Sequence, residues 1–274
     1  MSFAGLWLIL SSSGDWPEPK GDIAIVEVKG PIFESGPVNE KLEKYRKNPS
    51  VKAVVLRIDS PGGSVGASQE IYSEVKKLAL KKKVIVSMGA VAASGGYYIA
   101  VPAAKILANP GTVTGSIGVL MDHVEVEELL KWAKISAEIL KAGKLKDMGS
   151  SLRKMSPEDR IVLQGLLDNM HEQFLKAISE GRKIPLEEMR KIGTGQVYTG
   201  EQALALKLVD QLGNLQDAIE VAKNEVGIKG EPTLIRPHKK KPMWDILMGN
   251  DTEEKIQSMI GNLLTPKAMY WMSL

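Results

Sequence analysis

Short apolar runs alternate with longer amphipathic stretches over the first half of the chain. Runs typical of buried strands, rich in Val, Ile, Leu and Ala, cover residues 22–28, 51–58, 84–88, 105–108 and 135–140. Helices are predicted beside them at residues 36–48, 65–80 and 124–132. This alternation predicts βαβ units around a mostly parallel sheet, and therefore an α/β fold flanked by helices.

The second half of the chain has a mainly helical pattern. Ser156, Pro157 and Asp159 have the spacing of an N-cap, a first-turn proline and a reciprocal capping residue, and they open a helix expected to reach about Glu180. Further helices are predicted at 185–192, 201–206 and 214–226, before a strand-like segment at 231–236. We divide the chain into an apolar amino-terminal segment with a linker (1–20), a main α/β domain (21–230) and a carboxy-terminal strand with a helical, amphipathic extension and tail (231–274).

Both ends of the chain are apolar. Residues 3–10 form an apolar run of eight residues, shorter than the roughly 20 residues that a membrane-spanning helix needs. We interpret this run as the trimmed remnant of a membrane anchor, as a membrane-skimming segment or as a strand packed on the body. At the other end, amphipathic stretches at 244–248 and 253–264 precede an apolar tail at 269–274. The tail either lacks fixed structure or docks on another subunit, on a membrane surface or in a groove of the protein itself.

Composition narrows the possible chemistry. The 274 residues include no cysteine, which excludes disulfides, a cysteine nucleophile and thiolate metal sites but leaves the compartment open. The formal net charge of +3 is too small to indicate nucleic-acid binding. The histidines are His123, His171 and His238, so a Ser-His-Asp triad has few candidates.

The clearest candidate for chemistry is Ser94, within the glycine-rich stretch 89–100. Small residues and glycines around it suit a sharp turn from a strand into a helix, which would expose a nucleophilic hydroxyl. A turn that only packs closely is an equally good interpretation of this stretch alone. A second glycine turn, at residues 59–64, follows another predicted strand. Because parallel strands end at one edge of a sheet, the backbone amides of the two turns are expected to converge as an oxyanion hole for acyl transfer.

A serine nucleophile also needs a base. His171 is predicted on a helix surface and His238 in a basic stretch, whereas His123 is ambiguous. A lysine desolvated until its amine is neutral is the other known solution. Lys141, Lys144 and Lys146 lie in the loop after the run 135–140, and the physics of the sequence alone does not choose among them.

Several motifs, in order, resemble the signal peptide peptidase A family over about residues 20–230. They are DSPGG at 59–63, MGAVAASGGYYI at 88–99, TGSIGV at 114–119, KLKD at 144–147, VYTG at 197–200 and LVD at 208–210. Members of this family are serine proteases with a Ser-Lys dyad on a Clp-protease/crotonase-like fold. The chain departs from the pattern at Gln196, where arginine is expected, and in lacking a full-length amino-terminal membrane segment.

The resemblance implies a role for individual residues. Ser94 would be the nucleophile and Lys146 the general base. The backbone amides of Gly63 and Gly95 would form the oxyanion hole, and the Ser116 hydroxyl would orient the lysine amine. Asp147 is left as an ordinary loop carboxylate, while Tyr97 and Tyr98 are expected to be packing residues.

The resemblance therefore predicts a serine endopeptidase that cleaves apolar, unfolded peptides such as remnant signal peptides in or near a membrane. The protease domain would span residues 21–230, associate with a membrane and lie outside the cytoplasm. Family members assemble into rings or domes, so a homo-oligomer is expected. The chemistry requires no metal or nucleotide, and the sequence contains no Walker A motif.

Three alternatives share parts of this pattern. One is a protease with the same dyad that is specific for a membrane protein of the stomatin type. Another is a crotonase-type acyl-CoA enzyme, which would use carboxylates and would not need Ser94. The third is a non-catalytic scaffold that organises membrane complexes through its apolar ends.

Overall fold

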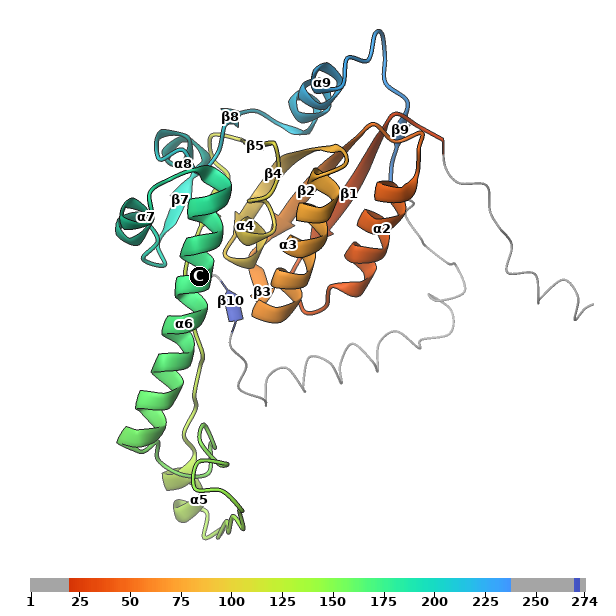
Figure 1. Cartoon of the computed structure of the whole chain (residues 1–274). Helices are drawn as coiled ribbons and strands as arrows, with labels where there is room; N and C mark the ends of the chain where they lie inside the picture. Colours follow the sequence, from red (N-terminus) through yellow and green to blue (C-terminus); the bar gives the residue numbers. More distant parts are fainter. Residues whose placement is uncertain (1–19, 238–268, 272–274) are drawn as a thin grey trace, which may run out of the picture.

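The structure is a computed structural model that describes residues 20–237 and the backbone of residues 269–271. Its main feature is a sheet of eight strands, in which neighbours along the principal path follow the order β7-β6-β4-β2-β1-β9 (Figure 1). The strands are β1 (Ile23–Lys29), β2 (Ala53–Ser60), β4 (Lys83–Ala93), β5 (Lys105–Ala108), β6 (Val113–Gly115), β7 (Val197–Thr199), β8 (Gln211–Leu212) and β9 (Leu234–Ile235). The pair β6–β7 is antiparallel, and the other pairs of this sheet are parallel, as the sequence predicts.

Helices cover both faces of the sheet. They are α2 (Gly36–Lys47), α3 (Val65–Ala79), α4 (Gly95–Tyr98), α5 (Glu127–Trp132), α6 (Pro157–Arg182), α7 (Leu186–Ile192), α8 (Gly200–Ala205) and α9 (Leu215–Glu225). Alternate side chains of β1 point to opposite faces of the sheet. Val26 belongs to the core shared with α2, α3, α4 and α6, whereas Ile25 packs in the cluster covered by α9. The central strands are therefore buried on both faces, which explains their nearly continuous apolar sequence.

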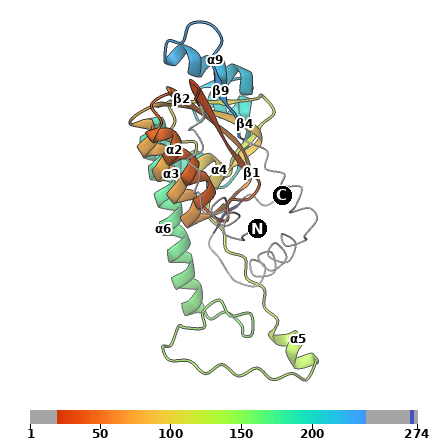
Figure 2. The ribbon, with the colours of Figure 1, turned by 90° about the vertical axis from the view of Figure 1, so that its right-hand side faces the viewer.

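Helix α6 is the longest element and extends well beyond the sheet. Its start has the predicted capping box, in which the Ser156 hydroxyl accepts from the Asp159 amide and the Asp159 carboxylate accepts from the Ser156 amide. Phe174 and Ile178, in its carboxy-terminal half, are fully buried against the core. At its other end lies a projecting segment that we call the arm (residues 120–155), which includes α5 and lies away from the sheet (Figures 1 and 2).

The arm is where the sequence predictions are least accurate. The predicted strand at residues 135–140 is wrong, because this segment has no strand structure and Leu140 is 90% exposed. The helix predicted at 124–132 begins only at Glu127. An apolar run predicts that its side chains are buried, but it does not say whether a neighbouring strand or another molecule buries them.

The ends of the chain lie largely outside the described residues. This applies to the apolar run 3–10 and to the amphipathic stretches 244–248 and 253–264. The exception is β10 (Met269–Trp271), whose backbone pairs antiparallel with the short strand β3 (Gly62–Ser64). In the ranges that the structure describes, no helix combines the length and apolar character needed to cross a membrane.

Candidate active site

Two glycine-rich turns lie side by side where β2 and β4 end. The strands β2 and β4 run parallel, with Ser60 opposite Ala92. After β2 the chain enters β3, and after β4 it passes through Ser94 into α4. This arrangement agrees with the expectation that both turns meet at one edge of the sheet.

Ser94 is held in a backbone conformation that is unusual for a residue with a side chain. Its φ is 53° and its ψ is −120°, and its amide donates to the Gly115 carbonyl at 2.8 Å. The side chain is fully buried, and its Oγ has no hydrogen-bond partner in the described part of the chain. Buried hydroxyls are normally paired, and strained backbone clusters at functional sites. The turn is thus a strand-to-helix elbow that presents a free hydroxyl.

Gly63 and Gly95 approach each other closely, as the oxyanion-hole prediction requires. A Cβ placed on Gly95 would lie 3.3 Å from the Gly63 amide nitrogen and would collide with Ser68 Oγ. The Gly62 carbonyl and the Ser64 amide are bonded to Ile32 on one side of β3. Because successive backbone groups of an extended strand point to opposite sides, the Gly63 amide faces away from Ile32, toward the edge of β3 that pairs with β10.

Ser116 also lies next to the elbow. It follows Gly115, whose carbonyl accepts from the Ser94 amide, and it is nearly buried with a φ of 49°. Its own amide donates to the Gln196 carbonyl at 2.8 Å. The structure therefore gathers Ser94, Gly63, Gly95 and Ser116 in one place, and Gln196, the departure from the expected pattern, supports Ser116 through its backbone.

Lys146 is not part of this cluster within one chain. Its side chain is exposed in the arm, in a loop attached to the first turn of α6 by an ion pair of 2.5 Å between Lys144 and Glu158. The part of the molecule that carries Ser94 contacts α6 at Phe174, whose ring lies 4.9 Å from that of Tyr98. Along the helix, positions 158 and 174 are separated by about 24 Å, at 1.5 Å per residue. That distance is far beyond the reach of a lysine side chain.

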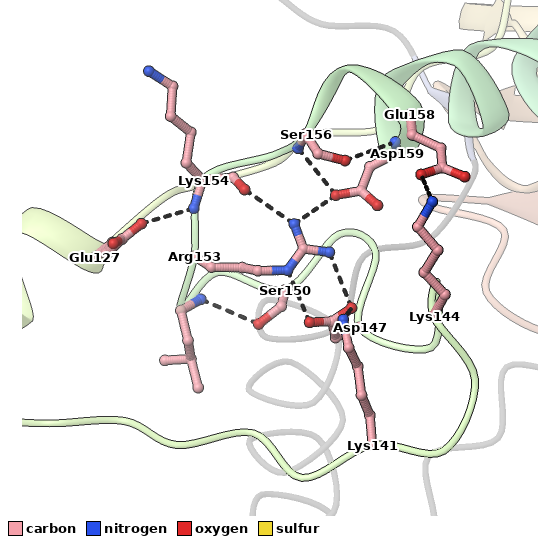
Figure 3. A network of polar contacts seen from close by, with 11 residues as sticks. Glu127, Lys141, Lys144, Asp147, Ser150, Arg153, Lys154, Ser156, Glu158 and Asp159 are labelled. Atoms are coloured by element: carbon pink, nitrogen blue, oxygen red, sulfur yellow. Dashed lines mark hydrogen bonds and ion pairs between the residues drawn. The ribbon is translucent and has the colours of Figure 1, made fainter.

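The three lysines of this loop differ in their contacts. Lys141 pairs with Asp147 at 2.6 Å, and Lys144 pairs with Glu158 (Figure 3). The backbone amide of Lys146 donates to the Gly143 carbonyl, but its side-chain amine has no hydrogen bond or ion pair to any residue that the structure describes. Of the three candidates left open by the sequence, Lys146 is thus the amine free to approach a serine from outside.

Neither of the two histidines that the structure describes is hydrogen-bonded to Ser94. The expectation of a helix-surface position for His171 is wrong: its Nε2 lies 2.7 Å from the Gly193 carbonyl and 3.1 Å from the Ile117 carbonyl, half-buried between them. His123 lies in the arm, and its Nε2 has no partner among the described residues. His238 lies outside the described residues.

The two tyrosines after the elbow are packing residues, as expected. The hydroxyl of Tyr97 donates to the Leu208 carbonyl at 2.7 Å, and Tyr98 packs against Tyr72 and Phe174. Burial raises the pKa of Tyr97 far above its ordinary value and that of Tyr98 to about 12. Both rings therefore stay neutral and do not act as bases.

The edge of β3 at Gly63 accepts an extended chain. In the antiparallel pair of β3 and β10, Tyr270 lies opposite Gly63 and Trp271 opposite Gly62. The backbone of β10 also contacts α3 and α4, which border the elbow. Of the docking places considered for the tail, the structure thus shows residues 269–271 on the protein's own chain, at the edge of β3.

A mostly parallel sheet with a buried serine at the elbow after β4, beside two glycine turns, is the arrangement of a serine hydrolase on a Clp protease-like fold. Comparison with known families agrees: residues 38–112 match the Clp protease family and residues 76–229 match Peptidase family S49. The S49 match covers more than half of the chain, and the chain belongs to this family as a serine peptidase of the signal peptide peptidase A type.

Individual relatives support the same assignment. A putative protease of Synechocystis sp. is 38% identical over 262 residues, which are 93% of this chain and 94% of the relative. Protease 4 of Salmonella typhi is 38% identical over 219 residues, or 76% of this chain and 35% of the relative. The chloroplastic serine protease SPPA of Arabidopsis thaliana is 35% identical over 238 residues, or 82% and 35%. The chain thus spans nearly all of the first relative but about a third of the other two.

Proposed function

We propose that this chain is an endopeptidase that uses a Ser-Lys dyad divided between two subunits. Ser94 of one copy supplies the nucleophile, and Lys146 on the arm of a neighbouring copy supplies the base. The observation that carries this proposal is that one chain holds Ser94 and Lys146 far apart. Ser94 Oγ is buried without a partner among the described residues, while Lys146 is exposed at the far end of α6.

The proposed reaction has two stages. Ser94 Oγ attacks the scissile carbonyl carbon as its proton passes to the uncharged amine of Lys146, and the amides of Gly63 and Gly95 bind the oxyanion. Collapse of the tetrahedral intermediate breaks the C–N bond, and the leaving amine takes the proton from Lys146. Water, deprotonated by the same amine, then attacks the acyl carbon. Collapse of the second tetrahedral intermediate breaks the bond between this carbon and Ser94 Oγ, which takes the proton back from Lys146 as the carboxylic acid leaves. The Ser116 hydroxyl, next to the elbow, would orient the incoming amine.

The surface of the arm supports assembly into a homo-oligomer. Large apolar side chains are exposed there, among them Trp132 at 82% and Leu140 at 90%, together with Ile161 on the nearby turn of α6. Exposed apolar surface of this extent marks an interaction site. A second copy of the chain would cover it and would also bring Lys146 out of water into a closed cleft, where a lysine amine can be neutral.

The β3 edge supports an extended peptide as the substrate. A peptide added as a strand gains backbone hydrogen bonds without regard to sequence, and β10 occupies this edge in the same way. Folded proteins do not present such free strands, which favours unfolded substrates. Apolar peptides, such as remnant signal peptides, fit the apolar character of the tail residues that pair there. The apolar run 3–10 supports a position at a membrane, with the catalytic domain outside the cytoplasm.

Hydrolysis of a mixture of apolar peptides by the wild type, Ser94→Ala and Lys146→Ala tests the proposal. Both substitutions are expected to abolish turnover while circular dichroism and oligomeric state stay unchanged. Activity that survives Ser94→Ala would contradict a serine mechanism and favour crotonase-type chemistry. Activity that survives Lys146→Ala would move the base to another residue. Cleavage of a single membrane protein in place of mixed peptides would contradict the broad substrate class.

A further inference from the structure

A compact polar network connects the loop of Lys146 to the start of α6 (Figure 3). Arg153 lies at its centre. Its Nε and Nη2 donate to the two oxygens of Asp147 at 2.8 and 3.0 Å, and its Nη1 donates to Asp159 at 2.5 Å. A planar guanidinium that contacts one carboxylate with two nitrogens fixes orientation as well as distance.

The network is more than a solvated ion pair on the surface. The side chain of Asp147 is 8% exposed and that of Asp159 is 1% exposed. Hydrogen bonds from Arg153, and then from Lys141, hold the pKa of Asp147 well below its ordinary value. Hydrogen bonds from Arg153 and from the Ser156 backbone lower the pKa of Asp159 to about 2. Both carboxylates are therefore ionised at neutral pH.

The two carboxylates belong to different parts of the molecule. Asp147 directly follows Lys146 in the arm, whereas Asp159 completes the capping box at the first turn of α6. Arg153 thus ties the backbone next to the base to a helix whose other end is packed in the core at Phe174. The sequence interpretation missed Arg153, and its signal was only a spacing of six residues to each of two aspartates.

We propose that Arg153 is a positioning residue for the general base. By bridging Asp147 and Asp159 it fixes the loop of Lys146 on the rigid end of α6, so that the arm presents the amine at one place to the Ser94 of a neighbouring subunit. This role rests on the proposed function, because it exists only if Lys146 is the base and acts between chains.

The test uses oligomers that contain two kinds of subunit. Ser94→Ala chains supply Lys146, and Lys146→Ala chains supply Ser94. The two chains are co-produced with different affinity tags and purified in tandem, so that every oligomer contains both. Arg153→Lys is then placed either on the chain that supplies Lys146 or on the chain that supplies Ser94. The two preparations have the same composition, and any general loss of stability affects both equally.

With Arg153→Lys on the chain that supplies Lys146, kcat is expected to fall on the order of 10²-fold at unchanged KM, the cost of a small displacement of a catalytic group. With Arg153→Lys on the chain that supplies Ser94, the rate is expected to equal that of the reference pair. Equal rates in the two placements would overturn the role of Arg153. An inactive reference pair would instead contradict the division of the dyad between chains, and the role of Arg153 with it.

Two further variants keep the result interpretable. Asp147→Asn breaks the same bidentate contact from the other side and should show the same dependence on placement, even if Arg153→Lys chains fold poorly. Arg190→Lys is the matched control, since Arg190 makes a bidentate contact to Glu172 of α6, at 2.7 and 2.8 Å, far from the arm. No dependence on placement is expected for it. A dependence as large as that of Arg153 would contradict a specific positioning role.

Discussion

Ser94 combines two unfavourable features that its surroundings stabilise. Its backbone lies in a region that L-residues rarely adopt, and its hydroxyl is buried without a partner among the described residues. Strain of this kind costs about 1 to 3 kcal/mol, and an unpaired buried hydroxyl adds a similar desolvation penalty. A residue kept at such a cost is better explained by chemistry than by packing.

Ser94→Gly is therefore expected to inactivate the protein and to stabilise it. Glycine adopts a positive φ without strain and removes the unpaired hydroxyl, while its greater freedom in the unfolded chain offsets part of the gain. We expect a net increase of about 1 kcal/mol in the free energy of unfolding, measured by urea denaturation. A variant less stable than the wild type would show that the elbow is not strained.

The close approach of Gly95 to Ser68 gives a second prediction. A methyl group at position 95 meets the hydroxyl of Ser68, so Gly95→Ala is expected to destabilise the fold by about 1 to 3 kcal/mol and to displace the backbone at this position. Ser68→Ala removes the obstructing oxygen, so the double variant should regain most of the lost stability in thermal denaturation. Gly165→Ala, at an open position of α6, is the control and should not destabilise. Additive losses in the double variant would contradict this packing.

At the scale of elements, α6 serves as a rigid spacer. Its carboxy-terminal half packs on α4 and the core, and its amino-terminal turn holds the loop of Lys146 through the Arg153 network. A helix of 26 residues keeps these two ends about 39 Å apart, at 1.5 Å per residue. The separation of Ser94 and Lys146 within one chain is therefore a consequence of the length of this helix.

The Asp159 carboxylate, at the first turn of α6, should make the free energy of unfolding depend on pH. The pKa of Asp159 lies near 2 in the folded chain, against an ordinary value of 3.8, so the folded state favours the ionised carboxylate. Its contribution is complete above about pH 4 and is lost as the pH falls toward 2. In urea denaturation, wild type and Asp159→Asn should differ most at neutral pH and converge near pH 2. A difference that stays constant with pH would contradict the role of the charge.

The elements of the sheet could be predicted from sequence, but the arm could not. Buried parallel strands such as β2 and β4 have continuous apolar sequences with turn residues at their ends. This pattern lies within the strand itself, so it can be recognised without the rest of the fold. The run 135–140 has the same apolar character, yet it lies exposed in the arm. Its conformation depends on what covers it, and one sequence contains no information about that partner.

The candidate site could likewise be predicted from the sequence only in part. The convergence of Ser94, Gly63 and Gly95 follows from the rule that parallel strands end at one edge of the sheet, and the structure bears this geometry out. Lys146 was identified by resemblance alone, and its catalytic role stays a prediction. Its position relative to Ser94 within one chain depends on the length of α6, which does not follow from local sequence.

At the scale of the whole molecule, the exposed arm is expected to be the main contact between subunits. Trp132→Asp and Leu140→Asp place charges on its apolar surface, so they should dissociate the assembly and abolish activity while each chain stays folded. Size-exclusion chromatography with light scattering measures the first effect and peptide hydrolysis the second. Leu80→Asp is the control, since Leu80 is 83% exposed but lies at the end of α3. Dissociated subunits with full activity would contradict the division of the dyad.

The most direct test of the central claim is the contact of Ser94 Oγ in an experimental structure of the assembled protein. The account predicts that Lys146 Nζ from a neighbouring subunit lies within hydrogen-bond reach of this oxygen, at about 2.6 to 3.2 Å. Lys146 in solvent in every subunit, with a different side chain bound to Ser94 Oγ, would contradict it.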